Sequence, residues 1–180
     1  MKILRRTQFG NPVLRTPTRE LSREEILSDS IQTLLADMRF TLEKKKYGVG
    51  LAAPQVGQSV AISVIGIKPT PTRPESPVIN MTIINPKIVR TYGRQEPMWE
   101  GCVSFGDTRN FPYAQVPRYK KLRLQYVDES ARLHERDFEG LLAHVLQHEV
   151  DHLQGILFVD RVEDATSYMT TAEYKKRLAK

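Results

Sequence analysis

Apolar residues recur at helical spacing between residues 27 and 42. They are Leu27, Ile31, Leu34, Leu35, Met38 and Leu42, which share one helix face. Just upstream, Ser22 and Glu25 have the spacing of a capping box, in which each side chain accepts a hydrogen bond from the other residue's backbone amide. The pattern predicts a helix that begins after Ser22 and ends near Tyr47, with Gly48 as a left-handed terminator. We expect its apolar face to pack against a sheet.

Strand patterns follow in the middle of the chain. Residues 60–67 form a short apolar run typical of a buried strand, and residues 121–126 alternate as in a half-exposed strand. Residues 132–138 are the expected hairpin partner of this second strand. A further apolar segment at 78–89 is interrupted by a proline, and the prolines of residues 68–77 predict an exposed loop.

The C-terminal third predicts a second helix and a polar tail. The helix is expected to begin near Gly140 and to end at Gly155, and the segment 172–180 is polar and also helical in pattern. Together these elements predict an α+β domain, in which small antiparallel or mixed sheets surround a central helix. We expect residues 1–180 to form this single domain, with the polar tail from about residue 164.

Composition narrows the class of protein. A chain of 180 residues suits one core, and no stretch approaches the roughly 18 apolar residues of a membrane span. A single cysteine excludes an internal disulfide, and no secretory signal pattern is present, so we expect a cytoplasmic location, with an organellar matrix left open. The net charge of +6 permits attraction to a ribosome, although a modest excess that only maintains solubility is favoured.

The candidate chemistry centres on His148, Glu149 and His152. Two histidines four residues apart lie on one face of a helix, where both can bind one metal ion. Glu149 is rotated about 100° from His148, which suits a general base that reaches a water without binding the metal. Two surface histidines on a charged helix are the alternative, but only 4 histidines occur in the chain and two have this spacing.

A catalytic site of this kind needs a third protein ligand. The downstream candidates are Asp160, Glu163, Asp164 and Glu173, and the upstream candidate is the only cysteine, Cys102. In chain order, residues 48–55 (GVGLAAPQ), 100–104 (EGCVS) and 147–155 (QHEVDHLQG) resemble the three motifs of the peptide deformylase family. The resemblance extends from Asn11 to about Asp160.

The resemblance implies both a site and a reaction. Cys102, His148 and His152 would hold the metal, with Fe²⁺ as the working ion and Zn²⁺, Ni²⁺ or Co²⁺ as substitutes. Glu149 would be the general base, while the side-chain amide of Gln55 and the backbone N–H of Val103 would stabilise the oxyanion. The implied reaction is hydrolysis of the N-formyl group from the initiator methionine of nascent polypeptides, with release of formate.

Residues expected to contact the substrate come from the motifs and their neighbours. They are Gly48, Val49, Gly50, Met98, Glu100, Leu141, His144, Val145 and Arg109. Gly50 is expected to let a substrate backbone pair closely in strand fashion, and the apolar members are expected to form a methionine pocket. Leu142 is placed equally well in the pocket or in the core. By resemblance, Glu100 is also expected to be a buried acid paired with Arg118. His144 lies one helical turn before His148 on the ligand face, so it is expected at the pocket rim or, as the weaker alternative, in contact with a ligand residue.

Residues 105–115 depart from the usual form of the second motif, and two explanations stay open. This aromatic loop walls the substrate cleft with Arg109 on the peptide carbonyls, or it is a surface excursion packed on the domain. The basic segment 174–180 is a candidate ribosome contact, with a solvated tail as the equal alternative. Two other functions are weighed: an HExxH metallo-endopeptidase, whose third ligand would lie downstream, and an inactive ribosome- or RNA-binding relative. No membrane or DNA partner is expected.

Overall fold

The computed structural model describes residues 1–45, 48–71, 73–106 and 110–178. The capping box of Ser22 and Glu25 is present, but the single helix predicted after it is wrong. The structure has α1 (Arg23–Leu27) and α2 (Asp29–Lys45) instead. Ser28 between them has an extended backbone, and its hydroxyl accepts a hydrogen bond from the amide of Ile31 while donating to the carbonyl of Glu25. A serine side chain that bonds the backbone in this way competes with helix continuation. The predicted end near Tyr47 lies outside the described residues.

An antiparallel sheet forms the body of the protein. Its strands are β1 (Gly50–Ala52), β2 (Ile62–Ile67), β3 (Ile79–Gly101), β4 (Pro112–Val127), β5 (Leu133–Glu139) and β6 (Met169–Thr170). The first five pair in chain order, and β6 adds to β4 near its beginning. The predicted hairpin of β4 and β5 is confirmed, with Leu124 opposite Arg136.

Strand β3 runs much farther than the apolar segment at 78–89 indicates. Its second half is polar on the exposed face and is held by pairing with β4 as far as Gly101 opposite Tyr113. Three register shifts bend this long ribbon, the first between Ile84 and Lys87. There Asn85 has a φ of 49°, and its side-chain amide bonds both the N–H and the C=O of Leu21. Bulges of this kind increase the local twist of a strand, which lets the ribbon curl.

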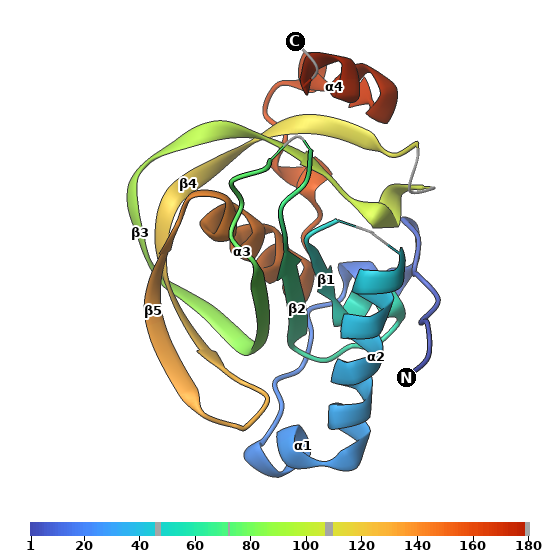
Figure 1. The fold of residues 1–180 in the computed structure, drawn as a ribbon, viewed down its shortest axis with the longest axis vertical. Coiled ribbons are helices and arrows are strands. Elements are labelled where there is room, and N and C mark those ends of the chain that lie inside the picture. Colours follow the sequence, from blue (N-terminus) through green and yellow to red (C-terminus); the bar gives the residue numbers. More distant parts are fainter. Residues whose placement is uncertain (46–47, 72, 107–109, 179–180) are drawn as a thin grey trace.

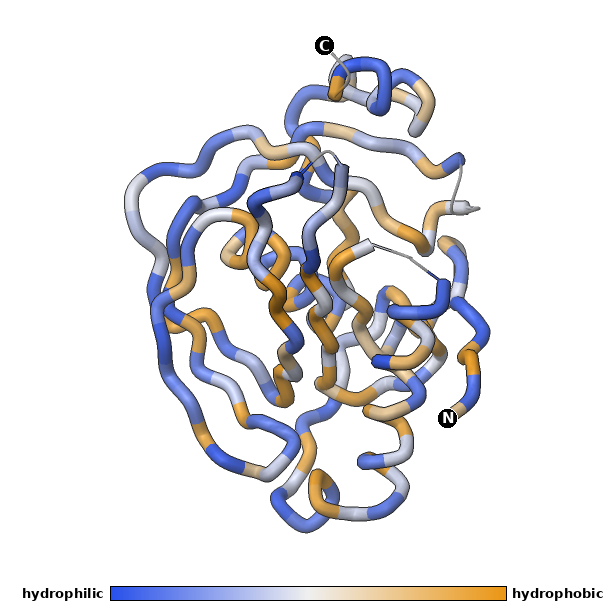
Figure 2. Tube along the Cα trace, viewed as in Figure 1, coloured by the Kyte–Doolittle hydropathy of each residue, from blue (hydrophilic) through white to orange (hydrophobic). Residues whose placement is uncertain are grey.

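The central helix, α3 (Gly140–Leu153), lies inside the curve of β3, β4 and β5 (Figure 1). Its buried residues extend all round the helix, as expected for an element enclosed by sheet. Strand β2 is buried on both faces: Val64 packs with α2 in one core cluster, and Ile65 packs with α3 in another. Figure 2 shows the resulting concentration of hydrophobic segments in the interior. The two core clusters, one on each face of β2, therefore hold α3 in place beside the short strand β1.

The C-terminal segment packs on the ribbon of β3 and β4. Helix α4 (Thr171–Leu178) begins beside β6, and the buried hydroxyl of Thr171 donates a 2.7 Å hydrogen bond to the carbonyl of Phe111. Figure 1 shows α4 on the outer side of the ribbon from α3. Among the described residues, no helix has the length and apolar character required to cross a membrane.

Candidate metal centre

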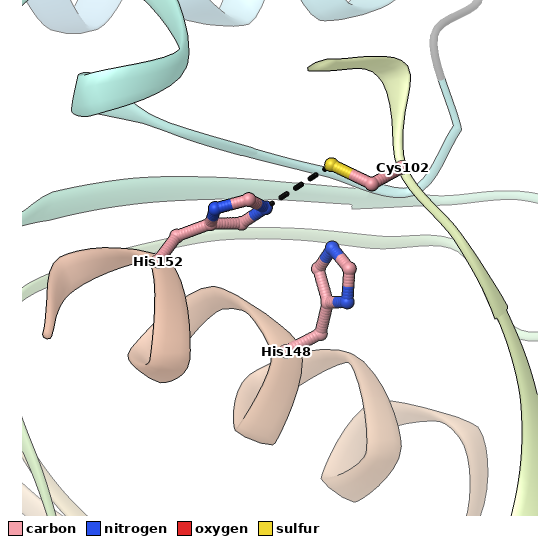
Figure 3. A group of neighbouring side chains, drawn as sticks. All are labelled: Cys102, His148 and His152. Atoms are coloured by element: carbon pink, nitrogen blue, oxygen red, sulfur yellow. Dashed lines mark hydrogen bonds between the residues drawn. The ribbon is translucent and has the colours of Figure 1, made fainter. Parts of the chain in front are cut away.

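Three donor atoms converge between α3 and the end of β3. The Sγ of Cys102 lies 3.3 Å from Nε2 of His152, and the ligand atoms of Cys102, His148 and His152 all lie within 4.8 Å of one another (Figure 3). Thiolate and imidazole ligands bind zinc-like ions at about 2.0–2.3 Å, so one ion fits between these atoms. Helical spacing brings the two histidines together, while Cys102 follows directly after Gly101, the last residue of β3.

The downstream carboxylates take other partners. Asp160 accepts hydrogen bonds from Arg15 and from the amide of Leu157, and Glu173 pairs with Lys176 at the surface. In the part of the chain that the structure describes, none of them joins the group of Cys102 and the two histidines. The endopeptidase alternative, which requires a downstream ligand, therefore has no support in the geometry.

The electrostatics of the centre favour a thiolate. Burial alone would raise the pKa of Cys102, but the charge of His152 and hydrogen bonds from both histidines lower it to about 5. Burial opposes the charged form of His148, but the carboxylate of Glu100 and the Cys102 sulfur raise its pKa well above the usual value. A thiolate is the form of cysteine that binds a metal, and a divalent ion would replace the protons as the positive partner.

Glu149, the expected general base, is buried at the floor of the cleft beside Cys102 and His148. Its side chain is buried, its Oε2 has no hydrogen-bond partner among the described residues, and burial raises its pKa to about 7. A Cβ added to Gly50 would lie 2.1 Å from Oε1 of Glu149. The absence of a side chain at Gly50 thus lets this carboxylate approach β1, which is a second reason for a glycine beside the expected substrate path.

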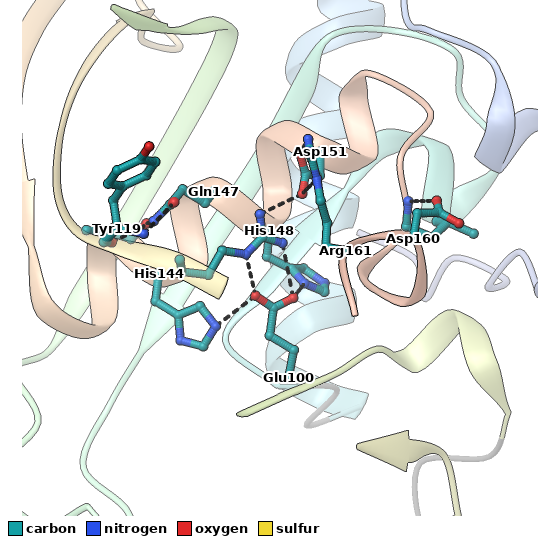
Figure 4. A network of polar contacts seen from close by, with 11 residues as sticks. Glu100, Tyr119, His144, Gln147, His148, Asp151, Asp160 and Arg161 are labelled. Atoms are coloured by element: carbon teal, nitrogen blue, oxygen red, sulfur yellow. Dashed lines mark hydrogen bonds and ion pairs between the residues drawn. The ribbon is translucent and has the colours of Figure 1, made fainter. Parts of the chain in front are cut away.

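Glu100 is the hub of a buried ion-pair network (Figure 4). Its Oε2 lies 2.7 Å from Nδ1 of His148, its Oε1 lies 2.9 Å from Nε2 of His144, and the guanidinium of Arg118 donates to both oxygens. Burial disfavours the charge, but these partners hold the pKa of Glu100 well below its usual range. The expected pairing with Arg118 is present. Because both oxygens bind protein groups, the carboxylate is placed to orient His148, and Glu100 also lines the cleft.

Sequence reasoning missed the continuation of this network. Arg118 also bonds Asp151, whose carboxylate accepts from Arg161 as well. Asp151 lies one helical turn from His148, so its position on a buried helix was a usable signal. Gln147 has a structural role that was also missed, since its amide bonds the backbone N–H and C=O of Tyr119 and ties α3 to β4.

The two expected oxyanion donors lie in the same cleft as Cys102. Gln55 is buried in a short 3₁₀ helix (Ala53–Val56), and its Oε1 accepts a hydrogen bond from the amide of Ala52. That bond fixes the orientation of its Nε2, which lies 3.4 Å from Sγ of Cys102 and 3.4 Å from Oγ of Ser104. Val103 begins the 3₁₀ helix that follows Cys102.

A cleft of about 590 Å³ opens over the centre. Of the residues expected to contact substrate, it is lined by Gly48, Val49, Gly50, Met98, Glu100, Leu141, His144 and Val145. Leu142 packs instead against the core around α3. Arg109 lies outside the described residues. The cleft also contains residues that sequence reasoning did not assign to a pocket: Arg73, Trp99, Tyr174 and Leu178.

The described residues of the loop after Cys102 fit partly one and partly the other of the two explanations offered for it. Phe105 packs inward, with its ring 4.5 Å from that of Phe9 and 5.2 Å from that of Phe158. Phe111 and Tyr113 line the cleft. The described part of the loop is therefore anchored on the domain at its start and forms cleft wall at its end.

A buried HExxH helix, set against a cysteine thiolate inside a curled antiparallel sheet, defines a metal-dependent hydrolase. The chain belongs to the polypeptide deformylase family, whose model matches residues 3–167. It is 37% identical to Peptide deformylase 2 of Nostoc sp., over 96% of this chain and 93% of that protein. It is 39% identical to the peptide deformylase of Thermomicrobium roseum, over 88% of this chain and 85% of the relative.

Solved structures agree with this assignment. The class I type b peptide deformylase of Acinetobacter baumannii with Met-Ala-Ser bound has a TM-score of 0.81 and 32% identity, covering 89% of this chain and 98% of that one. The Synechococcus elongatus peptide deformylase in complex with actinonin has a TM-score of 0.77 and 36% identity, covering 98% of this chain and 86% of that one. The structural similarity therefore agrees with the expected fold, in which a sheet surrounds a central helix.

Proposed function

We propose that this deformylase hydrolyses the N-formyl group of the initiator methionine on nascent polypeptides and releases formate. One observation carries the proposal beyond the family assignment. The buried carboxylate of Glu149, one of whose oxygens has no hydrogen-bond partner among the described residues, lies beside three convergent donor atoms in a cleft of about 590 Å³. Amide hydrolysis needs a proton acceptor, stabilisation of an oxyanion and a proton for the leaving amine, and the cleft contains a residue for each.

Different residues would have different roles in this reaction. Cys102, His148 and His152 would hold a divalent ion, which supplies Lewis acidity and makes water a stronger acid. Glu149, with a pKa of about 7, accepts the proton of the attacking water and passes it to the amine nitrogen as the amide C–N bond breaks. The Nε2 of Gln55, held by its bond to Ala52, donates to the developing oxyanion together with the N–H of Val103.

The substrate chain would pair with β1. Within the described part of the chain, this strand lies at the end of the sheet and pairs only with β2, so its other edge can accept an extended peptide. In this arrangement the methionine side chain enters the apolar part of the cleft formed by Val49, Met98, Leu141 and Val145. The carbonyl carbon of a formyl group carries only a hydrogen, so it can come close to the metal site. A bulkier acyl group would clash with the walls of the cleft.

A direct test is formate release from formyl-Met-Ala-Ser by protein purified without oxygen. The matched control substrate is acetyl-Met-Ala-Ser, which differs only at the acyl group. The proposal predicts formate and a free Met-Ala-Ser product, with at least ~10²-fold slower release of acetate. Cleavage between Met and Ala would instead support an endopeptidase, and the absence of any hydrolysis would support an inactive relative.

We propose Fe²⁺ as the working metal, with Zn²⁺, Ni²⁺ or Co²⁺ as substitutes. The thiolate of Cys102 supports this choice of soft and borderline ions over Mg²⁺ or Ca²⁺. An iron-loaded sample should lose activity in air faster than a zinc-loaded sample, because ferrous iron beside a thiolate promotes oxidation of the sulfur. Equal lifetimes in air would count against iron as the source of lability. Mass spectrometry of the protein distinguishes oxygenated Cys102 from simple loss of metal.

We further propose that the enzyme acts in the cytoplasm as one domain of residues 1–180, with α4 touching the ribosome. Lys175 and Lys176 are exposed on this helix. Removal of α4 would also remove Tyr174 and Leu178 from the cleft, so charge reversal is the better test. Lys175→Glu with Lys176→Glu should reduce ribosome co-sedimentation at low salt and leave peptide turnover intact. Unchanged co-sedimentation would contradict a ribosome contact through α4 and would leave this helix with a role in the cleft wall alone.

A further inference from the structure

Residues 6–9, which we call the N-terminal segment, join two short 3₁₀ helices beside the metal centre. The backbone N–H of Thr7 donates a 2.8 Å hydrogen bond to the C=O of Gln55, in the first of these helices. The N–H of Phe9 donates a 2.7 Å bond to the C=O of Ser104, in the second. The two helices carry the oxyanion donors proposed above, so one segment ties both donors to a common support.

The side chain of Arg6 adds a charged anchor to the second of these helices. Its Nη1 donates a 2.7 Å hydrogen bond to the C=O of Val103 and a 3.2 Å bond to the C=O of Gly106. The helix (Val103–Phe105) has a single turn, and the last carbonyls of a helix lack partners within it. A bond from a guanidinium is charge-assisted and stronger than one between neutral groups. Arg6 therefore fixes the carbonyl of the residue whose N–H is the proposed oxyanion donor.

Arg6 lies behind this helix and outside the cleft. Among the described residues, those that line the cleft begin at Gly48 in chain order, and they include both Gln55 and Val103. Arg6 borders a separate surface hollow together with Gln8. Any effect of Arg6 on the reaction must therefore pass through the backbone of Val103. The N–H and C=O of one residue are linked through two soft dihedral angles, so a fixed carbonyl restricts the direction of the N–H.

The direct contact between the two helices is longer than their contacts with the N-terminal segment. Nε2 of Gln55 lies 3.4 Å from Oγ of Ser104, beyond the 2.7–3.2 Å range of ordinary N–H···O bonds. The bonds from Thr7, Phe9 and Arg6 measure 2.7–2.8 Å. The relative placement of the two oxyanion donors thus depends more on the N-terminal segment than on the contact between the helices themselves.

We propose that Arg6 is a positioning residue for the deformylation reaction, which holds the N–H of Val103 in register with the side-chain amide of Gln55. The proposal rests on the function proposed above. Loss of one oxyanion donor costs on the order of 10²–10³-fold in rate, and a displacement of about 1 Å costs on the order of 10²-fold. Without Arg6 the helix is still tied through Ser104, so we expect a partial displacement and a fall in kcat of about 10-fold to 100-fold.

The test measures kcat and KM of the Arg6→Met protein for formyl-Met-Ala-Ser, with bound metal per chain and thermal unfolding on the same samples. Because oxyanion donors act in the transition state, kcat should fall by about 10-fold to 100-fold while KM stays within about 2-fold. Metal content should not change. Arg5→Met is the matched control, since it removes the same charge from an exposed neighbour and should retain wild-type kcat.

Arg6→Lys is the second variant, and it covers the case in which Arg6→Met does not fold. Lysine keeps the positive charge but has one nitrogen in place of the planar guanidinium fork. It should recover most of the activity, with kcat about 3-fold below that of the wild type and KM unchanged.

Three results would overturn the positioning role. They are wild-type kcat in Arg6→Met, a loss of kcat matched by a loss of metal, and no recovery in Arg6→Lys relative to Arg6→Met. Where Arg6→Lys alone folds, wild-type kcat in that variant would overturn it as well. Each of these results requires an active wild-type enzyme, and they are therefore distinct from failure of the proposed function, in which the wild type would release no formate.

Discussion

The close approach of Gly50 to Glu149 allows the general base to be moved without altering any metal ligand. In a Gly50→Ala variant the new Cβ would lie 2.1 Å from Oε1 and 2.7 Å from Cδ of Glu149. Ordinary contacts begin at 3.4 Å, so the carboxylate oxygen would have to move by at least about 1.3 Å. The φ of Gly50 is outside the left-handed range, and alanine itself is therefore not strained there.

The expected result is a loss of turnover with little loss of stability. Displacement of a catalytic group by about 1 Å costs on the order of 10²-fold in rate, and loss of general-base catalysis costs roughly 10²–10⁴-fold. We therefore expect kcat to fall by about 10²-fold or more. The displaced atoms are the end of a flexible side chain, so the free energy of unfolding should fall by only about 1 kcal/mol or less.

The assay measures kcat and KM for formyl-Met-Ala-Ser, bound metal per chain, and thermal unfolding. Gly66→Ala is the matched control in the neighbouring strand, because its Cβ would approach the end of the Leu42 side chain, with Cδ2 at 3.3 Å. This control should retain wild-type kcat. Two results would contradict a displaced general base: wild-type kcat in Gly50→Ala, or loss of the metal from this variant, which would place the damage in the ligands.

Two further predictions concern stability. Arg118→Met should lower the free energy of unfolding by about 3–5 kcal/mol, because it leaves the carboxylates of Glu100 and Asp151 buried without their shared cation; a loss below about 1 kcal/mol in denaturant titration would contradict this. Asp128→Ala should cost about 1–2 kcal/mol, since its carboxylate bonds His134 and the amides of Ser130 and Arg132. Burial opposes its charge, but these bonds lower the pKa of Asp128. Its contribution is therefore present above the unfolded pKa of about 3.9 and fades as the pH falls through the lower folded value. The stability gap between wild type and Asp128→Ala should narrow on acidification, and a gap that widens would be inconsistent.

The parts of the fold that could be predicted depend on local signals. The capping box at Ser22 and the hairpin of residues 121–138 involve neighbours in the chain, and both are present. The split of the first helix at Ser28 was missed because apolar spacing continues across it, whereas the break depends on one hydroxyl. The second half of β3 was missed because its bulges interrupt the alternation and its stability comes from pairing with β4.

The site residues likewise divide into those with a local signal in the sequence and those that depend on contacts between distant segments. His148 and His152 meet through helical spacing alone, and motif resemblance singled out Cys102, which the fold brings to them. The contacts of Asp151 with Arg118 and Arg161 link three segments, and no pattern within one segment predicts them. The stacking of Tyr174 on Tyr113 likewise depends on where α4 docks, and a basic polar segment carries no signal for a cleft wall.

We infer that Cys102 and the two histidines hold one ion and that Glu149 does not bind it. The most direct measurement is the metal content per chain of the Cys102→Ala and Glu149→Ala proteins, purified without oxygen beside the wild type. We expect a bound ion in the wild type and in Glu149→Ala, but not in Cys102→Ala, because two histidines alone do not complete a catalytic site. A full complement of metal in Cys102→Ala, or its loss from Glu149→Ala, would contradict this ligand assignment.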